Sequence, residues 1–308
     1  MVAALAAGEL DWPRIREYAW GTNVTGGCGG MLDAVGVHGI SQQQGGRAQL
    51  LGEWRNALTD GVQAARNLQA VQVPLTFDLG YYGNLFLADW PADAKGAATG
   101  DAGALKELAD GLSEDEQAWF AGIAADLPVA DTPPTKASLL ALPKPMQRLA
   151  AWLDASFGAA APAMFIGDLR QVRRYQQDDV LAEKIQGRVR EAMADGCTVL
   201  IGHSLGSVVA YETACAARTR PPSLLLTLGS PLGLATVRKR LRFVGPPADL
   251  RWVNVRDPRD PVACAGGLAR WWRDTQDVSV DNNDKPHAVN RYLGKWQTGD
   301  AVAQALGR

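Results

Sequence analysis

The 308-residue sequence lacks the features that mark membrane and secreted proteins. No run of about 18 consecutive apolar residues occurs, so no membrane-spanning helix is expected. The first twelve residues contain a short apolar run that Glu9 and Asp11 interrupt, with no basic segment before it. A secretory signal peptide has the opposite charge pattern. We therefore expect a cytoplasmic protein.

An excess of charge and a cysteine framework are absent as well. The formal net charge is −2, which gives no indication of a nucleic acid or an anionic membrane as partner. The four cysteines are scattered, with no Cys-x-x-Cys pair and no zinc-ligand spacing. We expect neither a metal site nor a disulfide framework. The cysteines are Cys28, Cys197, Cys215 and Cys264.

What the sequence does contain is the pattern of an α/β protein. Hydrophobic residues make up 47% of the chain, enough for a sizeable core. Short β-branched runs alternate with longer amphipathic ones, which predicts a mostly parallel sheet flanked by helices. The expected strands are 33–38, 71–77, 197–201, 223–228, 251–255 and 278–280, and the expected helices include 47–67, 207–217 and 288–293.

Two segments stand apart from this alternation. Residues 1–30 end in a glycine-rich stretch and are expected to form an irregular arm before a domain of residues 31–308. Residues 91–162 are rich in Ala, Pro, Asp and Gly, with short helical patterns at 104–111, 114–127 and 144–157. We interpret this stretch as a helical insertion, or cap, over one end of the sheet. It is either a packing layer or a lid that gates a substrate.

A highly charged segment follows the insertion. Residues 165–195 read as one long helix whose arginines and aspartates form a solvated face with i, i+4 pairs. Three tryptophans of the preceding region, Trp90, Trp119 and Trp152, either line an apolar acyl site or belong to the core of a helical layer.

The strongest functional signal is the sequence Gly202-His203-Ser204-Leu205-Gly206. This G-x-S-x-G pattern lies between a predicted strand and a predicted helix, the context in which it forms a nucleophile elbow. A sharp turn there exposes the serine hydroxyl, and glycines leave room for neighbouring backbone. The pattern predicts Ser204 as a nucleophile, which needs a base to remove its proton.

Only three histidines are available as the base. His203 lies inside the turn beside Ser204 and is expected to make local contacts. His38 ends the first predicted strand, before the nucleophile. His287 follows the last predicted strand in a polar loop, which fits the chain order serine, acid, histidine. His287 is therefore the predicted base.

The acid that orients the base should follow a strand between Ser204 and His287. Asp257 and Asp260 both follow the strand at 251–255. We favour Asp260, which lies further from the strand, whereas Asp257 directly follows the strand end and suits a turn before its proline. Asp281 and Asp284 are weaker alternatives, since a local loop role explains them. The acid would hold the imidazole tautomer and stabilise the imidazolium.

Two backbone N–H groups are needed where negative charge develops on the substrate. The N–H of Leu205, the residue after the nucleophile, is one expected donor. The other should come from the loop after the first strand, where the sequence His38-Gly39-Ile40 places the N–H of Ile40. His38-Gly39 also fits a simple turn.

These motifs together resemble the α/β-hydrolase superfamily, and within it the lipase- and esterase-like bacterial serine hydrolases. The resemblance rests on 202–206, His38-Gly39, 260–262 and His287, with Val37–Ile40, Tyr82-Gly83 and 229–233 as further matching pieces. It spans roughly residues 33–295 and leaves the insertion poorly matched. It implies a Ser-His-Asp triad with no metal or organic cofactor, but it implies no particular substrate.

The resulting hypothesis is a serine hydrolase that cleaves a small-molecule or lipid-like acyl ester through an acyl-enzyme. One alternative is a thioesterase or acyltransferase acting on a carrier-bound acyl group, because residues 202–206 and 210–212 also resemble editing thioesterases. A third hypothesis, from a different class, is a non-catalytic binding module with a hydrolase fold.

Overall fold

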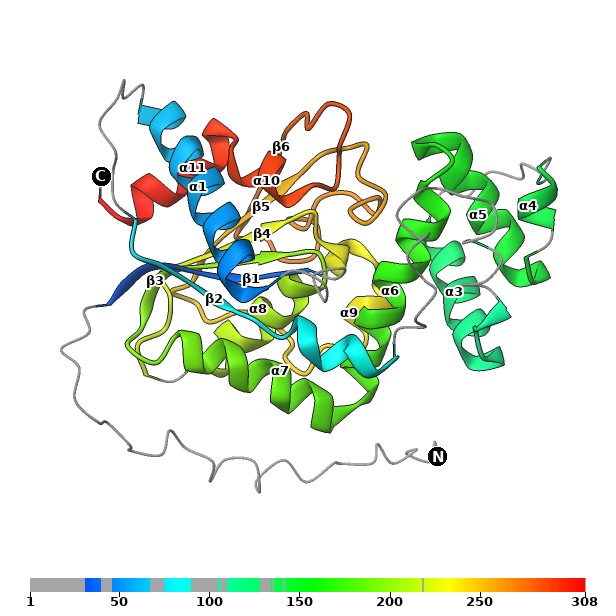
Figure 1. Ribbon diagram of the computed structural model, residues 1–308, viewed down its shortest axis with the longest axis horizontal. Helices are drawn as coiled ribbons and strands as arrows, with labels where there is room; N and C mark the ends of the chain where they lie inside the picture. The colour runs from blue at the N-terminus through cyan, green and yellow to red at the C-terminus, as the bar shows by residue number, and fades with distance from the viewer. Residues whose placement is uncertain are drawn as a thin grey trace, which may run out of the picture. The chain divides into compact units, whose positions relative to one another are not determined.

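A parallel sheet forms the centre of the protein. The computed structural model describes residues 31–39, 46–66, 75–89, 105, 110–127, 134, 136–140, 142–217 and 219–307. All of them lie in the second of two units into which the chain divides, Met31–Arg308. Its sheet has six strands in the order β2-β1-β3-β4-β5-β6, and every pairing is parallel (Figure 1). The strands are β1 (Leu32–Val37), β2 (Phe77–Gly80), β3 (Cys197–His203), β4 (Leu224–Leu228), β5 (Arg251–Arg256) and β6 (Thr275–Ser279).

Helices cover both faces of this sheet, so its central strands are apolar on both sides. On one face, α1 (Arg47–Arg66), α10 (Val289–Leu293) and α11 (Trp296–Ala305) pack on residues such as Val199 and Leu226. On the other face, Leu200 and Leu225 belong to a core shared with the remaining long helices. These are α6 (Ala161–Gln177), α7 (Asp179–Ala192) and α8 (Leu205–Ala216).

The expected α/β organisation is confirmed, with differences at particular elements. The strand predicted at 71–77 is instead β2 at Phe77–Gly80, and residues 67–74 lie outside the described part. The helix α11 was not predicted, and it contains a glycine, Gly299, a residue with low helix propensity. In the fold, a Cβ atom at this glycine would collide with the backbone of Gly61 in α1. Gly299 therefore permits the close packing of the two helices.

A helical insertion between β2 and β3 is present, as the composition predicted. It contains α3 (Glu114–Asp126), α4 (Ala137–Leu140) and α5 (Lys144–Phe157). The start of α3 is fixed by a capping box between Ser113 and Glu116. Trp119 is buried here and meets Phe120 edge to face, with 5.2 Å between ring centroids. Trp90 lies outside the described residues.

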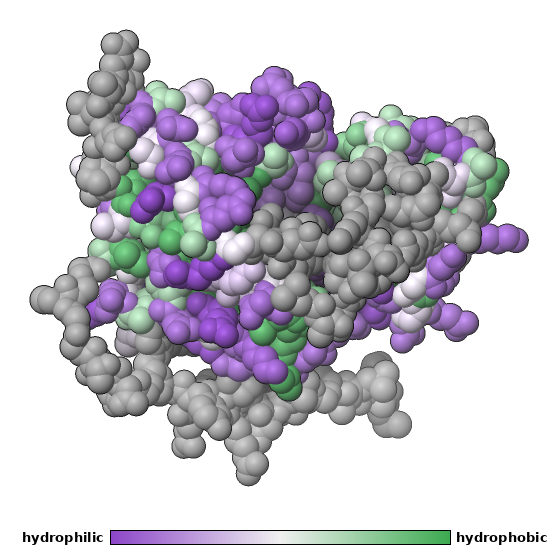
Figure 2. Space-filling view, viewed as in Figure 1, coloured by the Kyte–Doolittle hydropathy of each residue, from purple (hydrophilic) through white to green (hydrophobic). Residues whose placement is uncertain are grey.

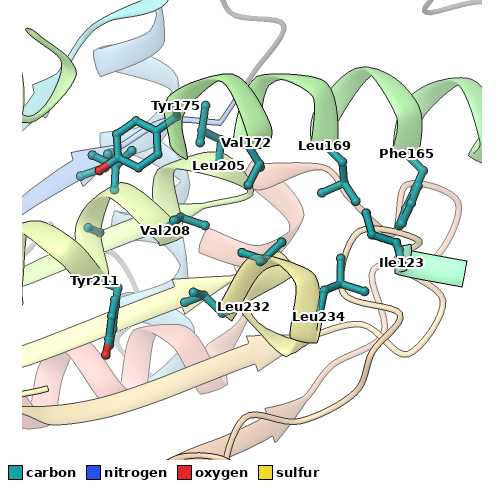
Figure 3. Packing of buried hydrophobic residues seen from close by; sticks show 14 of the residues in the cluster. Ile123, Phe165, Leu169, Val172, Tyr175, Leu205, Val208, Tyr211, Leu232 and Leu234 are labelled. Atoms are coloured by element: carbon teal, nitrogen blue, oxygen red, sulfur yellow. The ribbon is translucent and has the colours of Figure 1, made fainter. Parts of the chain in front are cut away.

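The single charged helix predicted at 165–195 is wrong. The segment forms two helices, α6 and α7, because Asp178 leaves the helical conformation and caps α7 by accepting the N–H of Leu181. The face of α6 is not solvated throughout either. Its buried residues include Phe165, Asp168, Leu169, Val172 and Tyr175. Figure 3 shows Val172 and Tyr175 beside Leu205 of α8, and Phe165 and Leu169 beside Ile123 of α3.

The strand order creates a topological switch point at the carboxyl ends of β1 and β3. From β1 the chain adds β2 on one side and then returns to form β3 on the other side of β1. Side chains at the carboxyl ends of β1 and β3 therefore flank the position where ligands bind in open α/β sheets. His38 follows β1 there, and Ser204 follows β3.

The described surface is mixed in polarity. Figure 2 shows hydrophilic and hydrophobic residues interspersed over the coloured part of one face. Among the described helices, none is both long and apolar enough to cross a membrane.

Candidate active site

Ser204 occupies the sharp turn between β3 and α8. Its φ of 53° and ψ of −126° lie where residues other than glycine are rarely found. A Cβ atom on Gly202 would lie 2.5 Å from the carbonyl oxygen of Gly206, and one on Gly206 would collide with the carbonyl oxygen of Val37. Both glycines of the motif are thus required by close backbone contacts. The turn is strained and tightly enclosed, as expected of a nucleophile elbow.

His287 and Asp260, distant in sequence from this turn, are in direct contact with each other. The Nδ1 atom of His287 lies 2.9 Å and 2.8 Å from the two carboxylate oxygens of Asp260. Asp260 is fully buried and also accepts hydrogen bonds from the N–H of Val262 (2.9 Å) and the hydroxyl of Tyr292 (2.7 Å). Three donors therefore fix the orientation of this carboxylate.

The competing aspartate, Asp257, has a different set of partners. It accepts the N–H groups of Arg259 and Asn282 and pairs with the Arg259 guanidinium. Its pKa is lowered, because these hydrogen bonds and the arginine outweigh the opposing effect of burial. Asp257 therefore organises the loop after β5.

The two weaker alternatives are exposed residues. Asp281 pairs with Arg259, and Asp284 pairs with Arg291. Neither contacts the imidazole of His287 among the interactions of the described residues.

A glycine that the sequence analysis placed only in a matching turn makes room for the His287–Asp260 pair. Gly229 follows β4 and has a φ of +52°. A Cβ atom there would lie 2.5 Å from Oδ2 of Asp260 and 3.2 Å from Nδ1 of His287. A positive φ is readily adopted only by glycine, and a side chain here would collide with Asp260. Both facts explain why this position is a glycine.

The structure adds a second carboxylate, Asp168 of α6, which the sequence analysis missed. Its Oδ2 atom lies 3.1 Å from Oγ of Ser204 and 3.0 Å from Nε2 of His287. Asp168 is only 4% exposed, and Ser204 only 1%. Among the described residues, the Ser204 side chain has no other hydrogen-bond partner. Asp168 thus lies between the hydroxyl of Ser204 and the imidazole of His287, two groups that the sequence analysis expected to contact each other directly.

One pattern in the sequence does identify Asp168. In a helix, residues three or four apart share a face, and position 168 falls between Phe165 and Val172 on the apolar stripe of α6. An acidic residue on such a stripe contradicts the expected burial of apolar groups. The contradiction was hidden because the whole segment was interpreted as a solvated, charged helix.

The two carboxylates determine the charge of His287. Burial lowers the pKa of its imidazole, but the charges of Asp260 and Asp168 and their hydrogen bonds outweigh burial and raise it to about 10. In this arrangement the ring is an imidazolium at neutral pH. It donates from Nδ1 to Asp260 and from Nε2 to Asp168, and the hydroxyl of Ser204 donates to the same oxygen of Asp168.

The other two histidines are neutral and support the site. Burial, with a further contribution from the charge on His287, lowers the pKa of His203 well below its usual value. Its Nε2–H then donates to the carbonyl oxygen of His287, 2.9 Å away, which ties β3 to the loop of the base. Burial lowers the pKa of His38 to about 4. The Nε2 atom of His38 accepts the N–H of Tyr82 at 3.0 Å, so Nδ1 carries the proton and donates to the carbonyl of Gly39.

The predicted oxyanion donors lie partly within the described residues. Leu205 is the first residue of α8, so its N–H has no acceptor within the helix. A Cβ atom on Gly39 would lie 2.9 Å from Cβ of Ser204, which brings the loop after β1 next to Ser204. Ile40, the other predicted donor, lies outside the described residues.

The Ala-Tyr-Glu sequence at 210–212, part of the thioesterase resemblance, has structural partners. Glu212 is fully buried in α8 and accepts hydrogen bonds from the hydroxyl of Tyr175 (2.6 Å) and the guanidinium of Arg242 (2.9 Å). These contacts join α6, α8 and the loop after α9 (Ala235–Arg238). Within the described residues, no group of three or more His, Cys, Asp or Glu side chains has the arrangement of a metal site.

The chain matches no protein-family model, no curated protein and no solved structure.

Proposed function

We propose that the protein is a serine hydrolase of the α/β-hydrolase type that cleaves a carboxylic ester through an acyl-enzyme. Ser204 attacks the ester carbonyl, His287 accepts its proton, and Asp260 holds the ring and stabilises the imidazolium. The proton then passes to the departing alcohol. Water attacks the acyl-enzyme with His287 as base, and the acid is released.

The single observation that carries the proposal is the strained Ser204 turn beside a buried His287–Asp260 pair. Strained backbone at a residue other than glycine persists where the surrounding structure enforces it, and it concentrates at functional sites. Here two glycines and a parallel strand enforce the strained backbone. The hydroxyl of Ser204 and the imidazole of His287 then lie close enough for one carboxylate, that of Asp168, to contact both.

The placement of these groups supports the same type of enzyme. The three residues occur in the order serine, acid, histidine, each after a parallel strand at one edge of the sheet. The N–H groups of Leu205 and Ile40 are the proposed oxyanion donors. Hydrolases of several chemistries share this fold, so the ester preference rests on the resemblance of the motifs to esterases and lipases.

The contacts of Asp168 add one requirement. Transfer of the proton from Ser204 to His287 needs direct contact between Oγ and an unprotonated Nε2. Both atoms now bind Asp168, so its side chain rotates away from them when the substrate enters, and the imidazolium releases its Nε2 proton to solvent water. Because both atoms bind the same oxygen, they already lie within two hydrogen-bond lengths of each other.

A fluorophosphonate probe together with p-nitrophenyl esters of increasing chain length tests the proposal. We expect the wild-type protein to be labelled and to hydrolyse esters. Ser204→Ala and His287→Ala should abolish both reactions, and Asp260→Asn should reduce turnover by several orders of magnitude. Ser223→Ala is the matched control, since this serine is exposed and its hydroxyl donates to the carbonyl oxygen of Thr198 in β3, away from the site.

Asp257→Asn separates the two possible acids. The partners of its carboxylate lie in its own loop and in that of Asn282, so a folded Asp257→Asn variant should keep most of its turnover. Thermal unfolding of each variant establishes that it is folded. Labelling that persists in Ser204→Ala, or a folded wild-type protein that neither reacts with the probe nor turns over any ester, would refute the proposed function.

A further inference from the structure

Asp168 is a buried carboxylate in contact with the reacting atoms, and the proposed triad does not use it. It contacts the nucleophile and the base through one oxygen, Oδ2. Among the described residues, Asp168 has no further hydrogen bond or ion pair. The next basic residue of its helix, Arg170, bonds to Glu116 instead. Ser204 and His287 are thus its only partners in this part of the chain.

The position of Asp168 is fixed by the packing of α6. Leu169 and Val172, which follow it, are fully buried against α8, and Phe165 precedes it in the same core. Figure 3 shows Val172 close to Leu205, and Leu169 and Phe165 on the side of Leu234 and Ile123. The helix therefore cannot withdraw without breaking this core. Asp168 moves by rotation of its own side chain, and its charge stays beside the reacting atoms.

Ester cleavage removes both donors that Asp168 has. In acylation, the bond from Oγ of Ser204 to the acyl carbon forms and the bond to the alcohol oxygen breaks. The proton of Ser204 passes through His287 to that alcohol. In the acyl-enzyme, Ser204 has no hydroxyl proton and the Nε2 atom of His287 is an unprotonated base. A buried carboxylate left without any donor is strongly unfavourable.

We propose that Asp168 is a specificity-determining residue that binds an electropositive group of the substrate, a hydroxyl or an ammonium group close to the scissile ester bond. This inference rests on the proposed hydrolase function. The substrate group replaces the donors that Ser204 and His287 withdraw, so the carboxylate remains paired through the reaction. A substrate with only apolar groups there leaves Asp168 unpaired and reacts slowly.

Two pairs of esters of one short-chain acid test the inference. The 2-hydroxyethyl ester is compared with the propyl ester, which replaces the hydroxyl by a methyl group. The 2-(dimethylamino)ethyl ester, whose protonated amine carries one N–H donor, is compared with the 3-methylbutyl ester, which has the same shape without the charge. We expect kcat/KM of the wild-type protein to favour the hydroxyl or the cationic member of at least one pair by about tenfold or more. The pair that responds identifies the type of group.

The Asp168→Asn variant should lose this preference, with the two members of each pair reacting within about threefold of each other. Asn retains the size of the side chain and removes the charge. Asp179→Asn is the matched control, because it removes a charge from the exposed start of α7 and should keep the wild-type ratios. A ratio of kcat/KM values within one protein is unaffected by the fraction of that protein that is folded.

The outcomes separate the two proposals. A wild-type protein that reacts with the fluorophosphonate and cleaves both members of each pair equally well keeps the hydrolase function and overturns the role of Asp168. So does a preference that survives unchanged in Asp168→Asn. A folded wild-type protein that neither reacts with the probe nor cleaves any ester overturns the hydrolase function and this inference with it.

Discussion

Asp168→Asn should shift the pH dependence of ester hydrolysis toward lower pH. The imidazole of His287 has a usual pKa of 6.5, which burial lowers and the two neighbouring aspartates raise, to about 10 overall. In the proposed mechanism the neutral ring is the reactive form, so the wild-type protein should gain activity steadily as the pH increases above neutrality. The profile of kcat/KM reports the pKa of the free enzyme, in which Asp168 is in place.

The magnitude follows from the groups that face the ring. Asp260 lies on the loop after β5, and Asp168 reaches the ring from α6. His203 on β3 is neutral, and the hydroxyl of Tyr292 on α10 bonds to Asp260. An opposite charge at hydrogen-bond distance changes a pKa by about 1–3. Removal of the Asp168 charge should therefore lower the apparent pKa of His287 by about 1–3, with Asp260 still raising it.

The assay is the rate of propyl ester hydrolysis from about pH 5 to about pH 10.5, a range that spans both pKa values, with Asp179→Asn as control. This ester offers no donor to Asp168. At neutral pH, the kcat/KM of the Asp168→Asn variant should therefore exceed that of the wild-type protein by about tenfold if the pKa of His287 falls by about 1, and by about a hundredfold if it falls by about 2. An NMR titration of the imidazole nitrogens gives an independent value, and with three histidines in the chain it is simple to assign. A wild-type pKa of His287 near its usual 6.5, or the same pKa in both proteins, would refute the reasoning.

Three further predictions concern the surroundings of the pair. Tyr292→Phe removes the hydrogen bond that the hydroxyl donates to the buried carboxylate of Asp260 and the one it accepts from the N–H of Asp257, so urea unfolding should show a loss of about 1.5–3 kcal/mol, together with a lower kcat. Gly229→Ala requires a strained φ and displaces Asp260, so it should lose at least about 1 kcal/mol in the same assay and nearly all labelling by the fluorophosphonate. The raised pKa of His287 means that its protonation stabilises the fold fully below pH 6.5 and that this contribution disappears as the pH rises to about 10. The unfolding free energy of the wild-type protein should therefore fall across this interval by about 3–6 kcal/mol more than that of His287→Ala, and equal slopes would contradict the raised pKa.

The sequence predicted the elements whose signals are local. β3, β4 and β5 are apolar runs with turns at both ends, and they appear within two residues of the expected bounds. The G-x-S-x-G pattern predicted a strand, a turn and a helix, and all three are present around Ser204. Asp260 was preferred to Asp257 from its distance to the strand, and in the structure it is Asp260 that contacts His287.

The sequence did not predict the features that depend on contacts between distant segments. Tyr292 contacts Asp260 only because α10 packs beside the loop after β5, and Gly229 matters only because that loop passes over it. Asp168 lies 36 residues before Ser204 and 119 before His287, and no short motif joins them. Their proximity results from the way α6 packs on α8, which no local pattern encodes.

The position of Asp168 also argues that it serves chemistry more than stability. The helix α6 presents an apolar stripe to the core, and the neighbours of Asp168 on that stripe are fully buried hydrophobic residues. Replacement of a buried ion pair by well-packed apolar residues is often neutral or stabilising, so the fold has no need of a carboxylate at this position. The carboxylate also binds the hydroxyl and keeps the ring protonated, which slows the attack that the rest of the site favours. Asp168 thus interrupts the apolar stripe of α6 and, in the absence of substrate, opposes attack by Ser204. Such a residue is consistent with selection for an interaction that forms only when substrate is present. A donor on the substrate would both release His287 to act as the base and keep Asp168 paired, so that recognition and activation depend on the same group.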